Sequence, residues 1–266
     1  MVEKSMSNVP GFEFFKKLAD IVKNTSLPLF RHPLSIDNKD LNGFDPVTIA
    51  DRETEIALRE YIHRERPDDG ILGEEFPTLE GLNNNLWVID PIDGTRSFIT
   101  GMPTWGSLVG LKTEGKAVAG IMAQPFTREI YYSCGKGAYL YTEIDGHHRK
   151  LSVSNCKLVD KATMMTTAPE LFDGQIRNRF QELSQKVRLT RYSADCYAFA
   201  MLASGFVDLV VETDLKPYDI TALIPIVEQA GGIIRQWNGK KAEDAGNIIA
   251  SATPELLEAA LSILND

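Results

Sequence analysis

The hydrophobic pattern of this chain changes its period along the sequence, and that change limits the possible fold more than any other feature. Residues 12–30 and 51–66 place apolar side chains at helical spacing. Further on, the pattern becomes a series of short β-rich runs, namely LWVI (86–89), GSLVGLKT (106–113), AVAGIMAQ (117–124), EIYYS (129–133) and AYLY (138–141). Turn-like TEGK, PFTR and CGKG separate the later runs, which therefore predict an antiparallel meander.

A second change follows the polar HHRK stretch at residues 147–150. From there, expected strands alternate with helices, the strands lying near 163–166, 187–191, 207–212, 233–236 and 247–251. The sequence thus predicts an α+β half over residues 1–150 and an α/β half over 151–266. Because no Gly/Ser linker separates them, we expect the halves to pack closely, with a cleft between them as the site.

Charge and cysteine content exclude several classes of function. With 28 basic and 37 acidic residues the net charge is −9, which is unfavourable for binding nucleic acid or an anionic membrane. The three cysteines have no CxxC spacing, so neither a disulfide framework nor a zinc site is expected. The beginning of the sequence lacks an apolar stretch of signal-peptide length, and no transmembrane run is present. We expect a soluble cytoplasmic protein.

The segment WVIDPIDGTRSF (87–98) is an apolar strand that ends in two acids, a proline and a glycine. Pro91 fixes its own φ and favours a tight turn, which would direct Asp90 and Asp93 to one side together with the Ile92 carbonyl. Such hard oxygen ligands suit Mg²⁺. Taken alone, the segment is also compatible with an ordinary turn.

Three further acids occur at the ends of expected elements. Glu74 follows the apolar pair Ile71-Leu72, Asp51 begins the second helix, and Asp219 begins the apolar helix TALIPIVEQA. Each has an ordinary alternative, because Glu74 suits a solvated surface and the two aspartates suit helix caps. Combined with the two acids of the 87–98 segment, they supply the carboxylates expected of a two- or three-metal hydrolase.

These motifs together resemble the inositol monophosphatase family, whose patterns stand here as DPVTIAD, GEE, WVIDPIDGT and, in weaker form, KPYDITALIPIVEQAGG. The similarity runs from Asp45 to about Gly232. It implies a layered αβαβα sugar-phosphatase fold, two or three Mg²⁺ ions and commonly a homodimer. It also implies a set of metal ligands, which are Glu74, Asp90, the Ile92 carbonyl, Asp93 and Asp219.

The resemblance also implies a mechanism of phosphate-ester hydrolysis. Asp51 and Thr95 would orient and deprotonate the attacking water, while Glu74 holds that water through a metal. The amides of Gly94 and Thr95, which open a helical turn toward Phe98, suit the phosphate oxygens. A haloacid-dehalogenase phosphatase is a different possibility, but its aspartate nucleophile belongs to a D-x-D motif, and the spacing here is D-x-x-D.

Substrate choice is expected to reside in RYSADCY (191–197) and in ETDLKPYD (212–219), which are similar to the histidinol-phosphate phosphatases of this family. Acidic side chains at Asp195, Glu212 or Asp214 would pair with the ammonium and imidazole of histidinol phosphate through charge-assisted hydrogen bonds. Arg191 is a further substrate-binding candidate. Asp195 also suits a helix cap, and Arg191 also suits a surface charge or ion pair.

Three readings of function therefore stay open. The first is a Mg²⁺-dependent phosphatase acting on histidinol phosphate in histidine biosynthesis. The second is an inositol-1-monophosphatase or another sugar- or nucleotide-phosphate phosphatase, although Tyr218 replaces the tryptophan that normally precedes the last metal-binding aspartate of the family. The third is a regulatory binding protein that uses the same scaffold without turnover.

Overall fold

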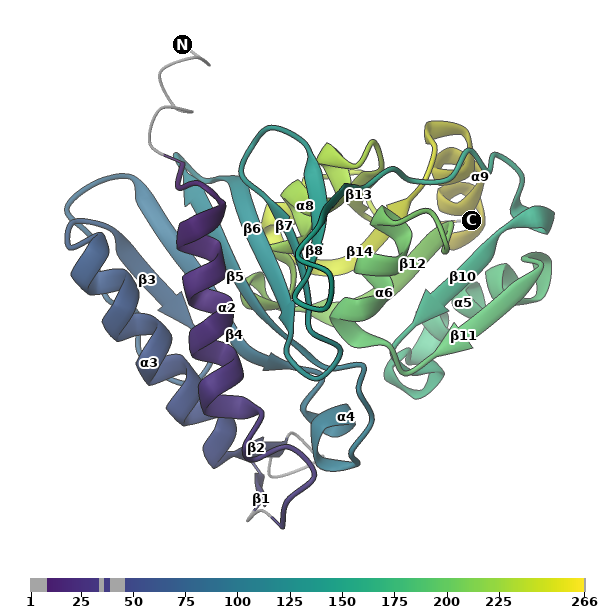
Figure 1. The fold of residues 1–266 in the computed structure, drawn as a ribbon. Helices are drawn as coiled ribbons and strands as arrows, with labels where there is room; N and C mark the ends of the chain where they lie inside the picture. Colours follow the sequence, from purple (N-terminus) through teal and green to yellow (C-terminus); the bar gives the residue numbers. More distant parts are fainter. Residues whose placement is uncertain (1–8, 34–35, 39–45, 266) are drawn as a thin grey trace.

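The structure, a computed structural model, describes residues 9–33, 36–38 and 46–265. Helices α2 and α3 open the described chain, and a series of strands follows them (Figure 1). The elements up to residue 150 are α2 (Phe12–Ser26), β1 (Ile36–Asn38), β2 (Pro46–Thr48), α3 (Ile49–Glu65), β3 (Gly70–Gly73), β4 (Asn85–Asp93), α4 (Thr95–Ile99), β5 (Gly106–Thr113), β6 (Lys116–Gln124), β7 (Glu129–Ser133), β8 (Ala138–Thr142) and β9 (His148–Lys150).

Strands and helices alternate through most of the remainder. These elements are η2 (Val159–Lys161), β10 (Thr163–Thr166), η3 (Pro169–Leu171), α5 (Gly174–Lys186), β11 (Leu189–Tyr192), α6 (Asp195–Ala203), β12 (Leu209–Leu215), α7 (Pro217–Ile220), α8 (Leu223–Gln229), β13 (Ile233–Gln236), η4 (Ala242–Asp244), β14 (Gly246–Ser251) and α9 (Pro254–Asn265).

The first sheet has seven strands in the order β3-β4-β5-β6-β7-β8-β9 and is antiparallel except between β3 and β4. Helices α2 and α3 cover one of its faces (Figure 1). Phe15 and Leu18 of α2 and Leu58 of α3 pack with Ile89 and Ile121 of the sheet, and all five are fully or almost fully buried. The helical spacing of these apolar residues explains why one face of each helix is covered.

The second sheet has five strands in the order β11-β10-β12-β14-β13. Helices α5 and α9 lie on its outer face (Figure 1), where Phe180 and Leu256 pack with Leu209 and Ile249 of the sheet. Strands β11, β10 and β12 are parallel, whereas β14 runs antiparallel to both β12 and β13. This mixed sheet therefore accommodates the alternating helices and strands that the sequence predicts.

Helices α6 and α8 form the layer between the two sheets. Their Phe199 and Ile226 share a core with Met122 of the first sheet and Ile248 of the second. Close approach requires glycine at one point, because a Cβ on Gly120 of β6 would lie 2.2 Å from a backbone oxygen at the start of α8. The order of layers is therefore αβαβα, which confirms the expected fold class. The boundary at residue 150 remains a prediction.

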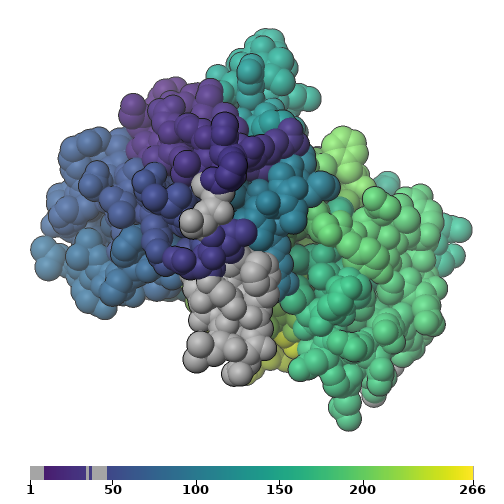
Figure 2. Space-filling view, turned by 90° about the horizontal axis from the view of Figure 1, so that it is seen from below, coloured from purple at the N-terminus to yellow at the C-terminus, as the bar shows by residue number. Residues whose placement is uncertain are grey.

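Most element positions agree with the sequence patterns. Strands β5, β7, β10 and β13 have the predicted limits, whereas β11 and β12 begin two residues later than expected. From the end of the molecule at which α4 lies, the purple and blue N-terminal half and the green C-terminal half lie side by side (Figure 2). Within the described ranges, none of the helices has the length and apolar character needed to cross a membrane.

Candidate active site

Strand β4 does not end in the tight turn predicted at Pro91 but continues through it to Asp93 as a bulged strand. Asp90 lies opposite Leu108 and Asp93 lies opposite Gly106, so three steps along β4 match two along β5. In a regular strand, residues three apart face opposite sides, and the extra residue of a bulge changes that direction. The prediction of a tight turn is therefore wrong, and a bulge places both aspartates in one site instead.

Asp219 joins these two aspartates from the second half of the chain. It lies in the first turn of α7, where one of its oxygens, Oδ2, accepts a 2.7 Å hydrogen bond from the Lys216 amide. The helix-cap alternative therefore holds for this residue. Its carboxylate also approaches Asp90 and Asp93, since one oxygen of each of the three lies within 4.8 Å of the others. The same side chain can thus serve the helix and the site.

Asp90, Asp93 and Asp219 form a trio whose burial and mutual repulsion favour the binding of a cation. Burial raises the pKa of Asp90 well above its ordinary value, and the charges of Glu74, Asp93 and Asp219 raise it further. Burial likewise raises the pKa of Asp93, with Asp195 as the next cause, and raises that of Asp219 to about 6. Three oxygen donors that repel one another in a partly dry site fit a hard divalent cation such as Mg²⁺.

Glu74 lies beside the trio rather than within it. It directly follows β3, which pairs in parallel with β4 so that Gly73 lies opposite Ile89, one residue before Asp90. This register brings the end of β3 next to the acidic end of β4. After burial, the nearby Glu74 charge is the next cause that raises the pKa of Asp90. The role of Glu74 as a ligand stays a prediction.

Asp51 and Thr95 meet although 44 positions separate them in the sequence. Thr95 Oγ1 lies 3.3 Å from Asp51 Oδ1 and 3.1 Å from the Ile92 carbonyl oxygen, with both in position to accept its proton. The other Asp51 oxygen accepts bonds of 2.8 and 2.7 Å from the amide and hydroxyl of Thr48, the N-cap of α3. Asp51 is therefore held by its helix while it faces Thr95. Asp45, which begins this motif, lies outside the described residues.

Gly94 connects β4 to α4 in a left-handed conformation with φ of 82°. An added Cβ would lie 2.9 Å from the Asp195 carboxyl carbon, so glycine is required here by both conformation and space. Ser97 Oγ in α4 donates a 2.8 Å hydrogen bond to Asp195 Oδ2. The start of α6 is thereby attached to the loop that carries the Gly94 and Thr95 amides, whose role toward phosphate stays a prediction.

A small pocket adjoins the trio and is walled mainly by the second half of the chain. It is lined by Asp93, Thr167, Asp195, Cys196, Phe199, Glu212, Leu215 and Asp219. Glu212 is buried and accepts bonds of 2.7 and 3.0 Å from the amide and hydroxyl of Thr167. Burial is the main cause that raises its pKa to about 8. Two predicted substrate residues, Asp195 and Glu212, thus line the pocket.

The other two predicted substrate residues lie elsewhere. Asp214 is exposed in the irregular stretch of β12 between Glu212 and Leu215, where its carboxylate pairs with Lys216 Nζ at 2.9 Å. Arg191 is exposed on β11, the edge strand of the second sheet. Neither residue is among those that line the pocket beside the trio. The structure therefore separates the four candidates into two that face the pocket and two that do not, and their roles stay predictions.

Sequence reasoning missed three groups around this pocket. The Cys196 amide donates a 2.5 Å hydrogen bond to Asp93 Oδ2, Thr167 holds Glu212, and Ser97 holds Asp195. Cys196 lies within the RYSADCY segment and Ser97 within WVIDPIDGTRSF, so both motifs contained a local signal. Thr167 follows β10 without an acid or glycine beside it, and only the parallel pairing of β10 with β12 brings it to Glu212.

The raised pKa of Glu212 predicts how the stability of the metal-free protein depends on pH. The folded pKa is about 8 and the ordinary value is 4.5, so between these values the folded state holds a proton that the unfolded state has lost. The stabilising contribution is complete below pH 4.5 and is lost as the pH rises through about 8. Thermal melting in EDTA at pH 5, 6.5 and 8 should show a smaller decline for Glu212→Gln than for the wild type. Equal declines would contradict this assignment.

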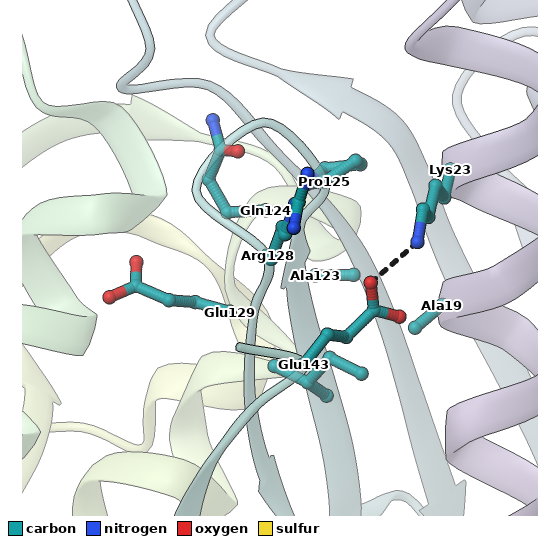
Figure 3. Close-up of a pocket in the computed structure, with 9 residues that line it drawn as sticks. Ala19, Lys23, Ala123, Gln124, Pro125, Arg128, Glu129 and Glu143 are labelled. Carbon is teal, nitrogen blue, oxygen red and sulfur yellow. Dashed lines mark hydrogen bonds and ion pairs between the residues drawn. The ribbon is translucent and has the colours of Figure 1, made fainter. Parts of the chain in front are cut away.

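A second pocket lies between α2 and the turn that joins β6 to β7 (Figure 3). Two of its charged side chains form an ion pair, with Lys23 Nζ 2.5 Å from Glu143 Oε2. None of the predicted site residues lines it. The carboxylate trio and its adjoining pocket are therefore the candidate active site.

Known proteins with similar sequences show which family this chain belongs to. A model of the inositol monophosphatase family matches residues 9–266. The chain is 34% identical to a histidinol-phosphatase of Chlorobaculum parvum, over 91% of this chain and 92% of that protein. It is 40% identical to the chloroplastic bifunctional phosphatase IMPL2 of Arabidopsis thaliana over 84% of this chain, a region that spans 63% of that relative.

Structural similarity extends over the whole fold. An inositol monophosphatase from Zymomonas mobilis superposes with a TM-score of 0.83 at 38% identity, covering 96% of this chain and 97% of that one. The family match, the similarity to a histidinol-phosphatase over nearly the full length of both chains and the αβαβα layers agree with one another. This chain therefore belongs to the inositol monophosphatase family, a family of phosphatases.

Proposed function

We propose that this protein is a Mg²⁺-dependent phosphatase that hydrolyses histidinol phosphate to histidinol and phosphate in histidine biosynthesis. The observation that carries the choice of substrate is the acidic pocket beside the trio, into which Asp195 and Glu212 both contribute carboxylates. A leaving group with an ammonium and an imidazole gains charge-assisted hydrogen bonds there, whereas a neutral polyol gains less. The similarity to a histidinol-phosphatase over nearly the full length of both chains supports the same choice.

In this proposal the metal is held by Asp90, Asp93 and Asp219, with Glu74 and the Ile92 carbonyl as the further ligands that the family resemblance implies. Bound Mg²⁺ would lower the pKa of water and neutralise charge that develops on the phosphate and leaving oxygen. The burial and mutual repulsion of the trio support this fit. The number of ions is taken as two or three.

In this proposal, individual residues of the chain have separate roles in hydrolysis. Thr95 Oγ1 orients the attacking water, and Asp51, which accepts the Thr95 proton at 3.3 Å, takes up the proton that the water loses. Water attacks phosphorus, the bond to the histidinol oxygen breaks, and that oxygen takes a proton from a solvent water, to which Asp51 returns the proton it received. The amides of Gly94 and Thr95 face the phosphate oxygens, while the pocket acids hold the histidinol amine.

The Thr95→Ala variant tests this division. Loss of the hydroxyl should lower kcat by about tenfold to a thousandfold while KM changes little, because general acid–base and orienting groups act on the transition state. Steady-state kinetics at saturating Mg²⁺ measures both constants. Thr95→Ser, which keeps the hydroxyl, is the matched variant and should retain most of the rate. An effect confined to KM would assign Thr95 to substrate binding instead.

Location and assembly complete the proposal. Three free cysteines, none in a disulfide within the described chain, suit a reducing cytoplasm. A homodimer is proposed on the family resemblance, and the exposed apolar side chains Met102 and Phe126 are compatible with a covered surface.

A phosphate-release screen with Mg²⁺, repeated in EDTA, tests the proposed function. The panel comprises histidinol phosphate, inositol 1-phosphate, fructose 1,6-bisphosphate and adenosine 3′,5′-bisphosphate. We expect Mg²⁺-dependent release that is fastest from histidinol phosphate. Faster release from another ester would support a different phosphatase of the family, and no release from any of them would favour a binding protein.

A further inference from the structure

A buried carboxylate lies under the loop that carries Glu74. Glu55 belongs to α3, four residues after Asp51, and its side chain is fully buried. Its Oε2 accepts a 2.7 Å hydrogen bond from the Glu75 amide, and its Oε1 accepts a 3.3 Å bond from the Phe76 amide. Both amides belong to the residues that directly follow Glu74. A single side chain of α3 therefore holds the backbone on one side of Glu74.

Arg59 holds the same loop through its carbonyl groups. Its Nε donates a 2.7 Å hydrogen bond to Glu55 Oε1, and its two terminal nitrogens donate bonds of 2.9 and 3.1 Å to the Phe76 and Pro77 carbonyl oxygens. The guanidinium fork suits this arrangement because its donors have a fixed planar geometry. Glu55 and Arg59 thus bind both amides and carbonyl groups of one short loop. The Arg59 charge also compensates for burying the charge of Glu55.

Gly73 fixes the other side of Glu74 and makes room for the same carboxylate. A Cβ at Gly73 would lie 1.9 Å from Glu55 Oε1 and 2.4 Å from its Cδ, so a larger residue there would displace the Glu55 carboxylate from the loop amides. Gly73 also lies in β3, paired with Ile89 of β4. Glu74 therefore lies between Gly73, which pairs with β4, and Glu75, whose amide binds Glu55.

We propose that Glu55, together with Arg59, is a positioning residue that sets the Glu74 carboxylate toward the trio and so increases the affinity of the site for Mg²⁺. The inference rests on the metal site of the proposed function but not on the identity of the ester. Glu55 itself touches the loop backbone, so its effect passes through Glu74. Residues that orient ligands without binding the ion commonly change metal affinity by about ten- to a hundredfold when replaced.

The Glu55→Gln variant tests the proposal with Mg²⁺ alone as the probe. Glutamine has nearly the same shape, but one of its terminal atoms is a donor that would oppose a donor of the loop or Arg59. We expect the Kd for Mg²⁺, measured by titration calorimetry on purified protein, to rise by about tenfold. Glu60→Gln, at an exposed position of the same helix, is the matched control and should leave the Kd unchanged.

Other measurements separate positioning from a purely structural role. A lower melting temperature of Glu55→Gln with an unchanged Kd for Mg²⁺ would overturn the proposal. If that variant does not fold, Arg59→Lys retains the charge but loses the fork, and an unchanged Kd there would overturn it equally. In the Glu55→Ala background, Gly73→Ala should cost much less Mg²⁺ affinity than in the wild type, because the clash has been removed.

Failure of the positioning proposal can be distinguished from failure of the proposed substrate. A wild type that binds Mg²⁺ but does not hydrolyse histidinol phosphate would refute the proposed ester while leaving the positioning result to stand on calorimetry. A wild type with no measurable Mg²⁺ binding would refute the metal site and this inference together.

Discussion

Replacing Asp90 by asparagine is expected to abolish hydrolysis while the protein remains folded. Asp90 is buried, and this burial, with the charges of nearby acids, raises its pKa. Asparagine keeps the shape but removes one charge from the group proposed to bind the metal. If metal contributes several kcal/mol of transition-state stabilisation, the loss in kcat/KM is on the order of a thousandfold or more.

The stability of the same variant gives an independent measurement. Without metal, Asp90→Asn should melt at a higher temperature than the wild type, because one member of a buried, mutually repelling group has been neutralised. Added Mg²⁺ should then stabilise the wild type more than the variant. Asp68→Asn, at an exposed position, serves as the control and should change neither property. Normal Mg²⁺-dependent turnover by Asp90→Asn would remove this residue from the site.

Replacing Glu212 by glutamine is expected to change specificity more than chemistry. Histidinol phosphate and a generic aryl phosphate present the same phosphate group, but only the former offers a cationic amine. A charge-assisted hydrogen bond contributes about 1.5–3 kcal/mol, so the relative loss in kcat/KM for histidinol phosphate is on the order of ten- to a hundredfold. Because the Glu212 pKa is raised to about 8, the loss should be greater at pH 8.5 than at pH 6.5.

The structure supplies controls for this comparison. Asp214→Asn alters an acid of the same segment that is exposed and paired with Lys216, so it should leave the ratio of the two substrates unchanged. Asp195→Asn alters the second acid of the pocket and shows whether Asp195 and Glu212 both bind the substrate amine. Equal losses for both substrates in Glu212→Gln would indicate a structural or metal-supporting role for Glu212, contrary to the proposal.

Local sequence patterns predicted many of the strands, and the family resemblance pointed to the three acids of the trio. The β-rich runs predicted the limits of β5 and β7, because each strand is an almost continuously buried run bounded by turn residues. The cap and ligand interpretations of Asp219 were not exclusive, since one of its oxygens caps α7 and the carboxylate still reaches the trio. At Asp90 and Asp93 the sequence predicted their proximity but attributed it to a turn instead of a bulge.

Groups that depend on tertiary packing were less accessible to sequence reasoning. The amphipathic pattern of α3 gives no reason for an acid on the buried face, and Glu55 is explained only by the loop amides that meet it. Conversely, Asp214 and Glu212 belong to one acidic segment, yet Glu212 is buried and Asp214 is exposed. The register of β12 shifts between Glu212 and Leu215. Distances of this kind arise from strand pairing between remote residues, which a local pattern does not contain.

A competition assay tests the central claim most directly. Equal concentrations of histidinol phosphate and inositol 1-phosphate are mixed with the wild-type protein and Mg²⁺, and the initial rates of histidinol and inositol formation are measured in the same tube. The ratio of the two rates equals the ratio of the kcat/KM values. Our account predicts at least about a tenfold preference for histidinol phosphate, the contribution of one charge-assisted hydrogen bond. Equal rates, or faster formation of inositol, would contradict it.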